Sequence, residues 1–206
     1  MWSHMSAGVG AVALLGLVGV PSTSGAQQYI DFTSIGCATP EYVAFASPFT
    51  IDGYTFTNAS NASYGSWCSS AAHYAGSAAL FIGGGNTTST LTRADGGYFS
   101  LLSISLGQLY GGQSNFVSIA FTGVRPDLTT VSQTFSFTGN GAMPALQGFV
   151  FDSDFSIVRS VSWNQGGNDL HQFDNPRVAA VPEPASILLM ASGLIGMAGL
   201  LRRRRR

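Results

Sequence analysis

The residues that could do chemistry in this chain are few and widely spaced. Its 206 residues include two cysteines, three histidines and ten acidic residues, but no lysine. Without lysine, Schiff-base catalysis and a P-loop phosphate site are excluded. No Gly-x-Ser-x-Gly elbow accompanies the histidines, so a serine hydrolase triad is disfavoured.

Carboxylates are the other candidates for catalysis. A glycosidase needs two carboxyl groups held across one sugar ring. Glu41 and the pair Asp152 and Asp154 are available, but they stand beside turn-like or strand-edge positions, where Asp is ordinary. We therefore expect no catalytic residues, no enzymatic activity and no cofactor, and a glycan-acting hydrolase is the less favoured alternative.

Cys37 and Cys68 are the only cysteines. In an exported protein they are expected to form one disulfide, which would close a loop of about thirty residues and stabilise by roughly 3 kcal/mol. Two free thiols or a thiol nucleophile are the alternatives, and a zinc site would need further ligands.

Sugar binding requires aromatic rings on an exposed surface, because the flat face of a sugar stacks on them. Tyr64 and Trp67 lie within residues 58–77, a stretch rich in Ser, Gly and Asn that predicts a loop. These two residues are therefore the candidate sugar-binding pair.

The elements that must position these side chains have the two-residue period of β-strands. Val117, Ile119 and Phe121 share one face and alternate with Ser118 and Ala120. Similar segments recur between glycine-rich turns, and no segment of ten residues has a convincing helical stripe. The predicted strands are 42–45, 53–57, 78–82, 88–93, 102–106, 116–121, 131–137, 146–151, 157–163 and 171–178. This pattern predicts an all-β fold for residues 27–180, an antiparallel β-sandwich or jelly roll.

The predicted domain is acidic. Residues 27–180 carry four arginines and nine acidic residues, a net charge of −5. DNA and RNA are disfavoured as partners, because their phosphates attract basic surfaces.

The first 26 residues have the features of a secretory signal peptide. An uncharged apolar run, residues 7–20, precedes Ser24-Gly25-Ala26, which fits a small-x-small cleavage site. We expect a signal helix, export of the chain and removal of residues 1–26, with an uncleaved anchor or a buried helix as the alternative.

The other end combines an apolar run with a cluster of arginines. Residues 185–201 are uncharged and mostly apolar, and at about 1.5 Å per residue such a helix just reaches across a hydrocarbon core. Because five arginines are costly to translocate, they would keep the end of this transmembrane helix in the cytoplasm. They are Arg202, Arg203, Arg204, Arg205 and Arg206.

A proline motif precedes the predicted helix. Val181, Pro182, Glu183 and Pro184 would stay extended and accessible, which suits a processing enzyme or a plain spacer. The order of motif, apolar helix and terminal arginines resembles the PEP-CTERM sorting domain of exported proteins of Gram-negative bacteria. The resemblance, over residues 181–206, implies recognition by an exosortase, a membrane-embedded cysteine transpeptidase.

This resemblance also implies where the protein goes. Export machinery would move the chain outward, the helix would anchor the precursor in the inner membrane, and the exosortase would send it to the cell surface or extracellular matrix. Genomes with this system commonly encode exopolysaccharide production, so the implied neighbour is an extracellular polysaccharide and the implied setting a biofilm.

Residues 27–180 resemble a recurrent domain type found before PEP-CTERM tails, through stretches such as 90–101 and 161–166. Those domains are expected to be jelly rolls similar to carbohydrate-binding modules, in which a final-strand Asp often joins the first strand around a structural calcium. That implies Asp174 with Asp31, and an Asp-Asn turn is the alternative. The expected function is a non-enzymatic, sorted envelope or matrix protein, and a lectin-like sugar-binding module is the alternative.

Overall fold

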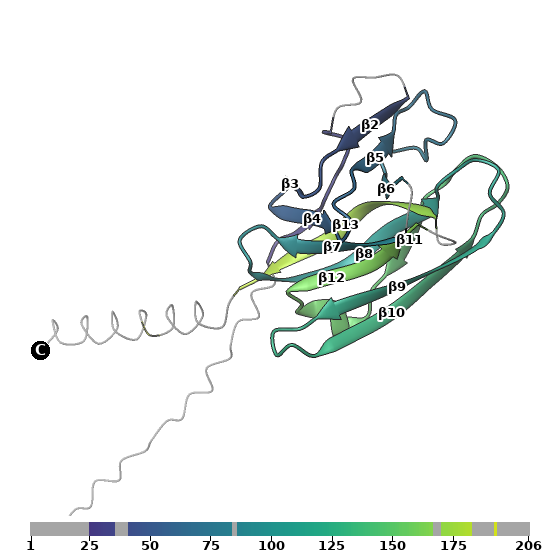
Figure 1. Cartoon of the computed structure of the whole chain (residues 1–206). Coiled ribbons are helices and arrows are strands. Elements are labelled where there is room, and N and C mark those ends of the chain that lie inside the picture. Colours follow the sequence, from purple (N-terminus) through teal and green to yellow (C-terminus); the bar gives the residue numbers. More distant parts are fainter. Residues whose placement is uncertain (1–24, 36–40, 84–85, 167–169, 183–191, 193–206) are drawn as a thin grey trace, which may run out of the picture.

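The middle of the chain, in which apolar and polar side chains alternate, folds into two antiparallel β-sheets. The computed structural model describes residues 25–35, 41–83, 86–166, 170–182 and 192. One sheet has the strand order β11 (Gln147–Val150), β8 (Tyr98–Gln108), β13 (His171–Val181), β6 (Leu80–Ile82), β5 (Tyr64–Trp67) and β2 (Tyr42–Phe45), and β1 (Gln27–Tyr29) also pairs with β13. The other has the order β10 (Thr130–Thr138), β9 (Phe116–Val124), β12 (Ser160–Gln165), β7 (Thr87–Arg93), β4 (Tyr54–Asn58) and β3 (Phe49–Ile51). The two sheets stack as a sandwich (Figure 1).

The facing sides of the sheets share one core, which is rich in aromatic rings. Phe173 of β13 lies with its ring centroid 5.1 to 6.4 Å from those of Phe32, Phe56, Tyr64 and Trp163. All five side chains are almost completely buried, and burying each stabilises the fold by about 1.5–3 kcal/mol. Since Phe56 and Trp163 belong to the opposite sheet, their contacts with Phe173 pack β13 against that sheet.

The sandwich expected from the sequence is confirmed. Val117, Ile119 and Phe121 of β9 are buried between less buried neighbours, as their two-residue period predicts. Each predicted segment overlaps an observed strand, whereas the short strands β1, β3 and β5 were not predicted.

The predicted signal helix and transmembrane helix lie outside the described residues, apart from Ser192. Within the part of the chain that is described, no helix has the length and apolar character needed to cross a membrane.

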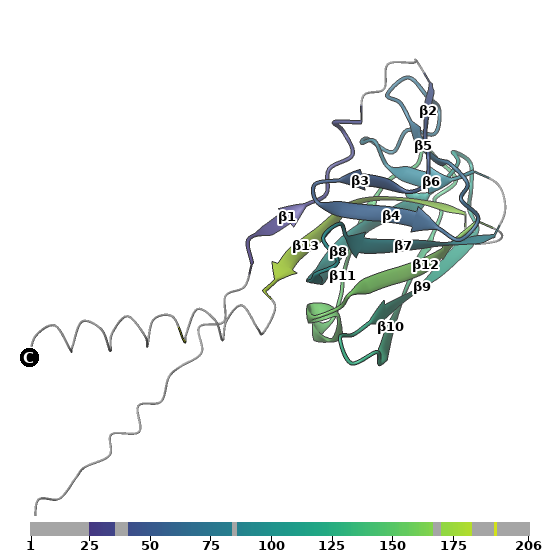
Figure 2. The same cartoon turned by 60° about the vertical axis from the view of Figure 1, so that its left-hand side comes forward.

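Both ends of the domain meet at one pole of the sandwich, where β1 lies beside the end of β13 (Figures 1 and 2). Gln27 pairs with Ala179, and a Cβ on Gly25 would collide with the carbonyl oxygen of Ala180. Only glycine permits this close approach. The chain therefore enters and leaves the domain at neighbouring positions.

Four connections gather at the same pole, which we call the tail end. Register places them there, because Tyr54 pairs with Arg93 and Ser160 pairs with both Thr92 and Val124. The four connections are residues 52–53, 94–97, 125–129 and 152–159, the last including the short 3-10 helix η1 (Ser153–Ser156). The opposite pole, the far end, holds the turn after β8.

Candidate functional site

The sequence motif expected to be processed begins where the sheet ends. Val181 is the last residue of β13 and pairs with Tyr98 of β8, and Pro182 follows outside the strand. Glu183, Pro184 and the arginines 202–206 lie outside the described residues. The sandwich thus holds the upstream side of the motif in place.

Charged side chains concentrate at the tail end. Three of the four arginines of residues 27–180 and five of the nine acidic residues lie in or beside its four connections. Arg93 Nη2 lies 2.5 Å from Asp95 Oδ2, and Arg125 Nη2 lies 2.6 Å from Asp154 Oδ1. These aspartates are more than half exposed, so each pair contributes at most about 1 kcal/mol.

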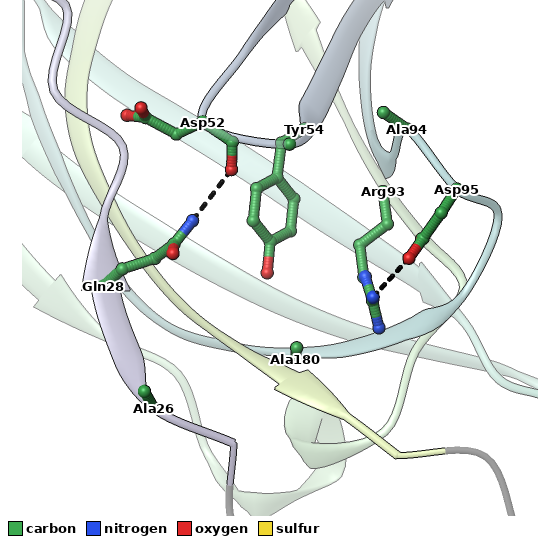
Figure 3. Close-up of a pocket in the computed structure, with 9 residues that line it drawn as sticks. Ala26, Gln28, Asp52, Tyr54, Arg93, Ala94, Asp95 and Ala180 are labelled. Carbon is green, nitrogen blue, oxygen red and sulfur yellow. Dashed lines mark hydrogen bonds and ion pairs between the residues drawn. The ribbon is translucent and has the colours of Figure 1, made fainter. Parts of the chain in front are cut away.

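A small cavity of about 280 Å³ lies between the two ends of the domain (Figure 3). Ala26 and Ala180 line it together with Gln28, Tyr54 and Arg93. Arg93 already donates to the Tyr98 carbonyl oxygen at 2.9 Å and pairs with Asp95, and Gln28 donates to the Asp52 carbonyl oxygen at 2.9 Å. These hydrogen bonds and this ion pair connect the segments that line the cavity, so Gln28 and Arg93 have a structural role there.

The structure contradicts the expectation that Tyr64 is exposed on a loop. Residues 64–67 form β5, and Tyr64 faces the core with no exposed surface. Its hydroxyl donates to the Thr57 carbonyl oxygen at 2.7 Å and lies 3.1 Å from Ser89 Oγ, while burial raises the pKa of Tyr64 to about 12. Tyr64 is therefore a core residue and no sugar platform.

Trp67, the other member of the predicted pair, lies on the opposite face of the sheet. Its ring stacks on Phe81 at 5.0 Å between centroids and lies 5.5 Å from Tyr42, 4.9 Å from His73 and 6.2 Å from Tyr110. These five residues form a cluster outside the core, which we call the outer aromatic patch. β8 begins with Tyr98 at the tail end and runs to Gln108 at the far end. Because Tyr110 follows Gln108 closely, the patch lies toward the far end.

Glycine shapes the outer aromatic patch. A Cβ on Gly65 would lie 2.6 Å from a ring carbon of Tyr42, so only glycine lets that ring lie across β5. Tyr42 remains 41% exposed and Trp67 is half-buried. The patch therefore presents aromatic surface to solvent, which Tyr64 does not.

Cys68 is buried just beyond the end of β5. Cys37 lies outside the described residues, so its pairing with Cys68 stays a prediction.

Asp174 is a carboxylate buried on the face of β13 away from the core. The register of β13 with β8 shifts between Asp174 and Arg177, and Asn175 has a φ of 50°, which marks a β-bulge. Asp174 accepts hydrogen bonds from Ser77 Oγ and from the Asn175 backbone N at 2.7 Å. Burial raises the pKa of Asp174, these two hydrogen bonds lower it, and the Asp31 carboxylate raises it further.

The two predicted calcium ligands lie on neighbouring segments, because Ile30 N, next to Asp31, donates a hydrogen bond to the carbonyl oxygen of Pro176, two residues after Asp174, at 2.9 Å. Both carboxylate oxygens of Asp31 accept hydrogen bonds from Thr33, at 2.8 and 2.7 Å. Two carboxylates fit part of an oxygen-only ligand set, but Ca²⁺ takes six to eight oxygens. No cluster of three His, Cys, Asp or Glu suited to a metal occurs among the described residues. Backbone carbonyls and water would have to complete this site, which stays a prediction.

Comparison with known proteins identifies the tail. Residues 180–206 match the protein family described as the PEP-CTERM protein-sorting motif. The C-terminal segment is a PEP-CTERM sorting motif. No curated protein matches the chain.

The domain ahead of the PEP-CTERM motif has distant structural similarities. A family 11 carbohydrate-binding module of a cellulosomal cellulase from Clostridium thermocellum is 10% identical with a TM-score of 0.33, covering 78% of this chain and 97% of the module. The family 11 module from Clostridium thermocellum in complex with a β-1,3-1,4-mixed-linked tetrasaccharide is 12% identical with a TM-score of 0.34, and the match covers 77% of this chain and 96% of the module. The enzymatically active domain of bacteriophage CBA120 tailspike protein 4 is 11% identical with a TM-score of 0.25, and the match covers 74% of this chain and 20% of the tailspike chain. These similarities concern the β-sandwich alone.

The raised pKa of Asp174 predicts how the stability of the domain depends on pH. Because its folded-state pKa is raised, its contribution to stability is greatest below the unfolded-state pKa of about 4 and is lost as the pH rises through the folded-state value. In calcium-free buffer, the stability of Asp174→Asn relative to the wild type should therefore increase with pH, measured by urea unfolding from acid to neutral pH. Asp127→Asn should show the opposite slope, since hydrogen bonds from Thr129 lower the pKa of Asp127. A flat profile for Asp174→Asn would contradict the burial of a charged group.

The calcium prediction is tested on the same Asp174→Asn variant. Calcium should raise the melting temperature of the wild type, by an amount equivalent to about 2.7 kcal/mol at a hundred times Kd, and a chelator should reverse the rise. The variant should show no such rise, since it lacks the buried carboxylate. Absence of any calcium shift in the wild type would remove the site.

Proposed function

We propose that this chain is the precursor of an exported, non-enzymatic protein of the cell envelope or extracellular matrix, which an exosortase-type transpeptidase processes at its C-terminal motif. The match of residues 180–206 to the PEP-CTERM sorting motif carries this proposal. The precursor would stand in the inner membrane on its apolar segment until the cut releases or attaches the domain at the surface.

The end of β13 supports a cut beyond Val181. β8 pairs with β13 as far as Val181, and β1 pairs with its other edge as far as Ala179. A peptidase needs an extended backbone whose hydrogen-bonding groups are free, so cleavage within this ladder would first require strands to separate. Pro182, which follows the strand and cannot donate a ladder hydrogen bond, is the first residue beyond this ladder.

The partners of the acidic side chains and of His73 support a domain without catalysis. Asp31, Asp95, Asp127 and Asp152 each accept a hydrogen bond from a backbone N two residues later in a turn, the ordinary role of Asp in turns. His73 Nδ1 accepts a hydrogen bond from the Gly111 backbone N at 3.0 Å. These groups hold loops in place.

Sugar binding at the outer aromatic patch is the second candidate function. The observation that favours it is an aromatic cluster outside the core, in which Tyr42 is 41% exposed and Trp67 is stacked on Phe81. Rings fixed in this way provide a flat, rigid surface for a sugar face. An extracellular polysaccharide is the ligand class that this surface and the sorting motif suggest together.

Mass spectrometry of the C-terminus in the native host tests the sorting proposal. The mature protein outside the cytoplasm should end within Pro182 to Pro184, and any added mass there identifies its attachment. Glu183→Ala should accumulate the uncut tail, whereas Asp52→Ala, which alters another acidic residue at the tail end, should be cut normally. Recovery of an intact Leu201-Arg202 bond in all mature protein would defeat the proposal.

Binding to exopolysaccharide isolated from the same host tests the second candidate function. Tyr42→Ala and Trp67→Ala should each weaken binding by about tenfold, because a stacking contact contributes on the order of 1.5 kcal/mol. Phe116→Ala is the matched control, since Phe116 is 65% exposed on β9 in the other sheet. Equal affinities for wild type and both patch variants, measured by calorimetry on folded protein, would exclude this site.

A further inference from the structure

Three side chains meet on the outer face of the sheet where β1 pairs with β13. Tyr29 lies opposite Arg177, and Gln27, two residues earlier, projects from the same face. Arg177 Nη2 donates a hydrogen bond to the side-chain Oε1 of Gln27. The guanidinium carbon of Arg177 lies 5.7 Å from the centroid of the Tyr29 ring, a cation–π contact that holds the guanidinium in place.

We propose that Gln27, once export has removed residues 1–26, cyclises to pyroglutamate with the help of Arg177. This inference rests on the proposed export, because the expected cut after Ala26 is what gives Gln27 an α-amino group. The three residues Gln27, Tyr29 and Arg177 form the modification site, which needs no added cofactor.

The reaction is an intramolecular aminolysis. The unprotonated α-amino nitrogen of Gln27 attacks its own side-chain carbon Cδ, and a new C–N bond closes a five-membered lactam. The bond from Cδ to Nε2 breaks, and Nε2 leaves as ammonia after taking one proton from the attacking nitrogen. No oxidant or reductant is consumed. An α-amino group titrates at about pH 8, so part of it is unprotonated at neutral pH.

Arg177 assists where negative charge develops. Attack on Cδ pushes electron density onto Oε1, the atom to which Arg177 already donates. A positively charged donor at that position stabilises the tetrahedral intermediate more than the neutral amide. The lactam keeps Oε1 as its carbonyl oxygen, so the same hydrogen bond is available to the product.

The backbone of Gln27 is free to react. Ile30 N donates to the Pro176 carbonyl oxygen at 2.9 Å, and hydrogen-bonded pairs alternate along an antiparallel ladder. Gln27, which lies opposite Ala179, therefore occupies a non-hydrogen-bonded position with its nitrogen directed away from β13. Lactam formation at this exposed residue costs no ladder hydrogen bond.

The composition of the chain makes the modification easy to count. The sequence contains no lysine, so the α-amino group is the one primary amine that a mature chain beginning at Gln27 can have. Cyclisation would leave the mature protein with no primary amine.

The experiment follows freshly exported wild-type protein from the native host. An amine-reactive reagent should at first label the mature chain and then lose its target, while the N-terminal peptide loses the mass of one ammonia. Arg177→Met should slow this loss by about tenfold, less than in a dry oxyanion hole because the hydrogen bond from Arg177 to Gln27 is exposed to solvent. Arg93→Met, at the same pole but bonded to Asp95 and Tyr98, should leave the rate unchanged.

A comparison within the wild type covers the case that Arg177→Met fails to fold. Denatured mature protein should cyclise about as slowly as the variant, since unfolding separates Arg177 from Gln27. An amine that persists, a mature chain that begins elsewhere than Gln27, or equal rates in folded and denatured wild type would each overturn the inference. The C-terminal peptide reports the sorting cut separately, so failure of the sorting proposal is distinguishable.

Discussion

The pairing of β13 with its neighbours is the interaction on which the rest of the structure depends. In the order of its sheet, β13 separates β11 and β8 from β6, β5 and β2. Its contact with β6 includes the register pair Phe173 and Leu80, so the packing of Phe173 against the opposite sheet helps to join the two halves. This central strand is also the last strand of the domain. The sandwich can therefore close only after residues 171–181 are in place, and the last of these residues already belong to the sorting motif.

The domain separates its two surfaces of interest by polarity. Most of the arginines of the domain and both ends of the domain lie at the tail end, while the outer aromatic patch lies toward the far end. A chain held by its tail would direct its charged pole toward the membrane and its aromatic surface away from it. Processing and ligand contact would then take place on different sides of the domain and would not compete for space.

The two-residue period predicted most of the sheet, because a strand with one face in the core leaves a clear alternation, as in β9. The same rule failed where strands are short or irregular. Strict alternation through the predicted strand 157–163 puts Ile157 on one face with Val161 and Trp163, yet Ile157 is exposed and Val158 is buried. The chain makes an isolated bridge from Val158 to Phe99 before β12 begins, and this shift in phase has no signal in composition.

The candidate site shows the same limit. Residues 64–67 were predicted as a loop because Gly and Ser surround the aromatic residues, and the alternation that assigns Tyr64 to the core and Trp67 to the outer face becomes meaningful only once β5 is known to be a strand. The sorting tail could be predicted from the sequence because its motif, apolar run and arginines follow one another directly along the chain. The outer aromatic patch joins Tyr42, Trp67 and Tyr110 across the sheet, and a pairing between distant strands is set by the whole fold.

The adjacency of β1 and the end of β13 has a mechanical consequence. A surface protein attached near Val181 and pulled by the polymer around it would carry the load along the axis of β13. Such a force shears the hydrogen bonds to β8 and β1 together, whereas a force across the strands would peel them apart one at a time. An attachment at this point would therefore resist tension, because its load would fall on both neighbours of β13 at once.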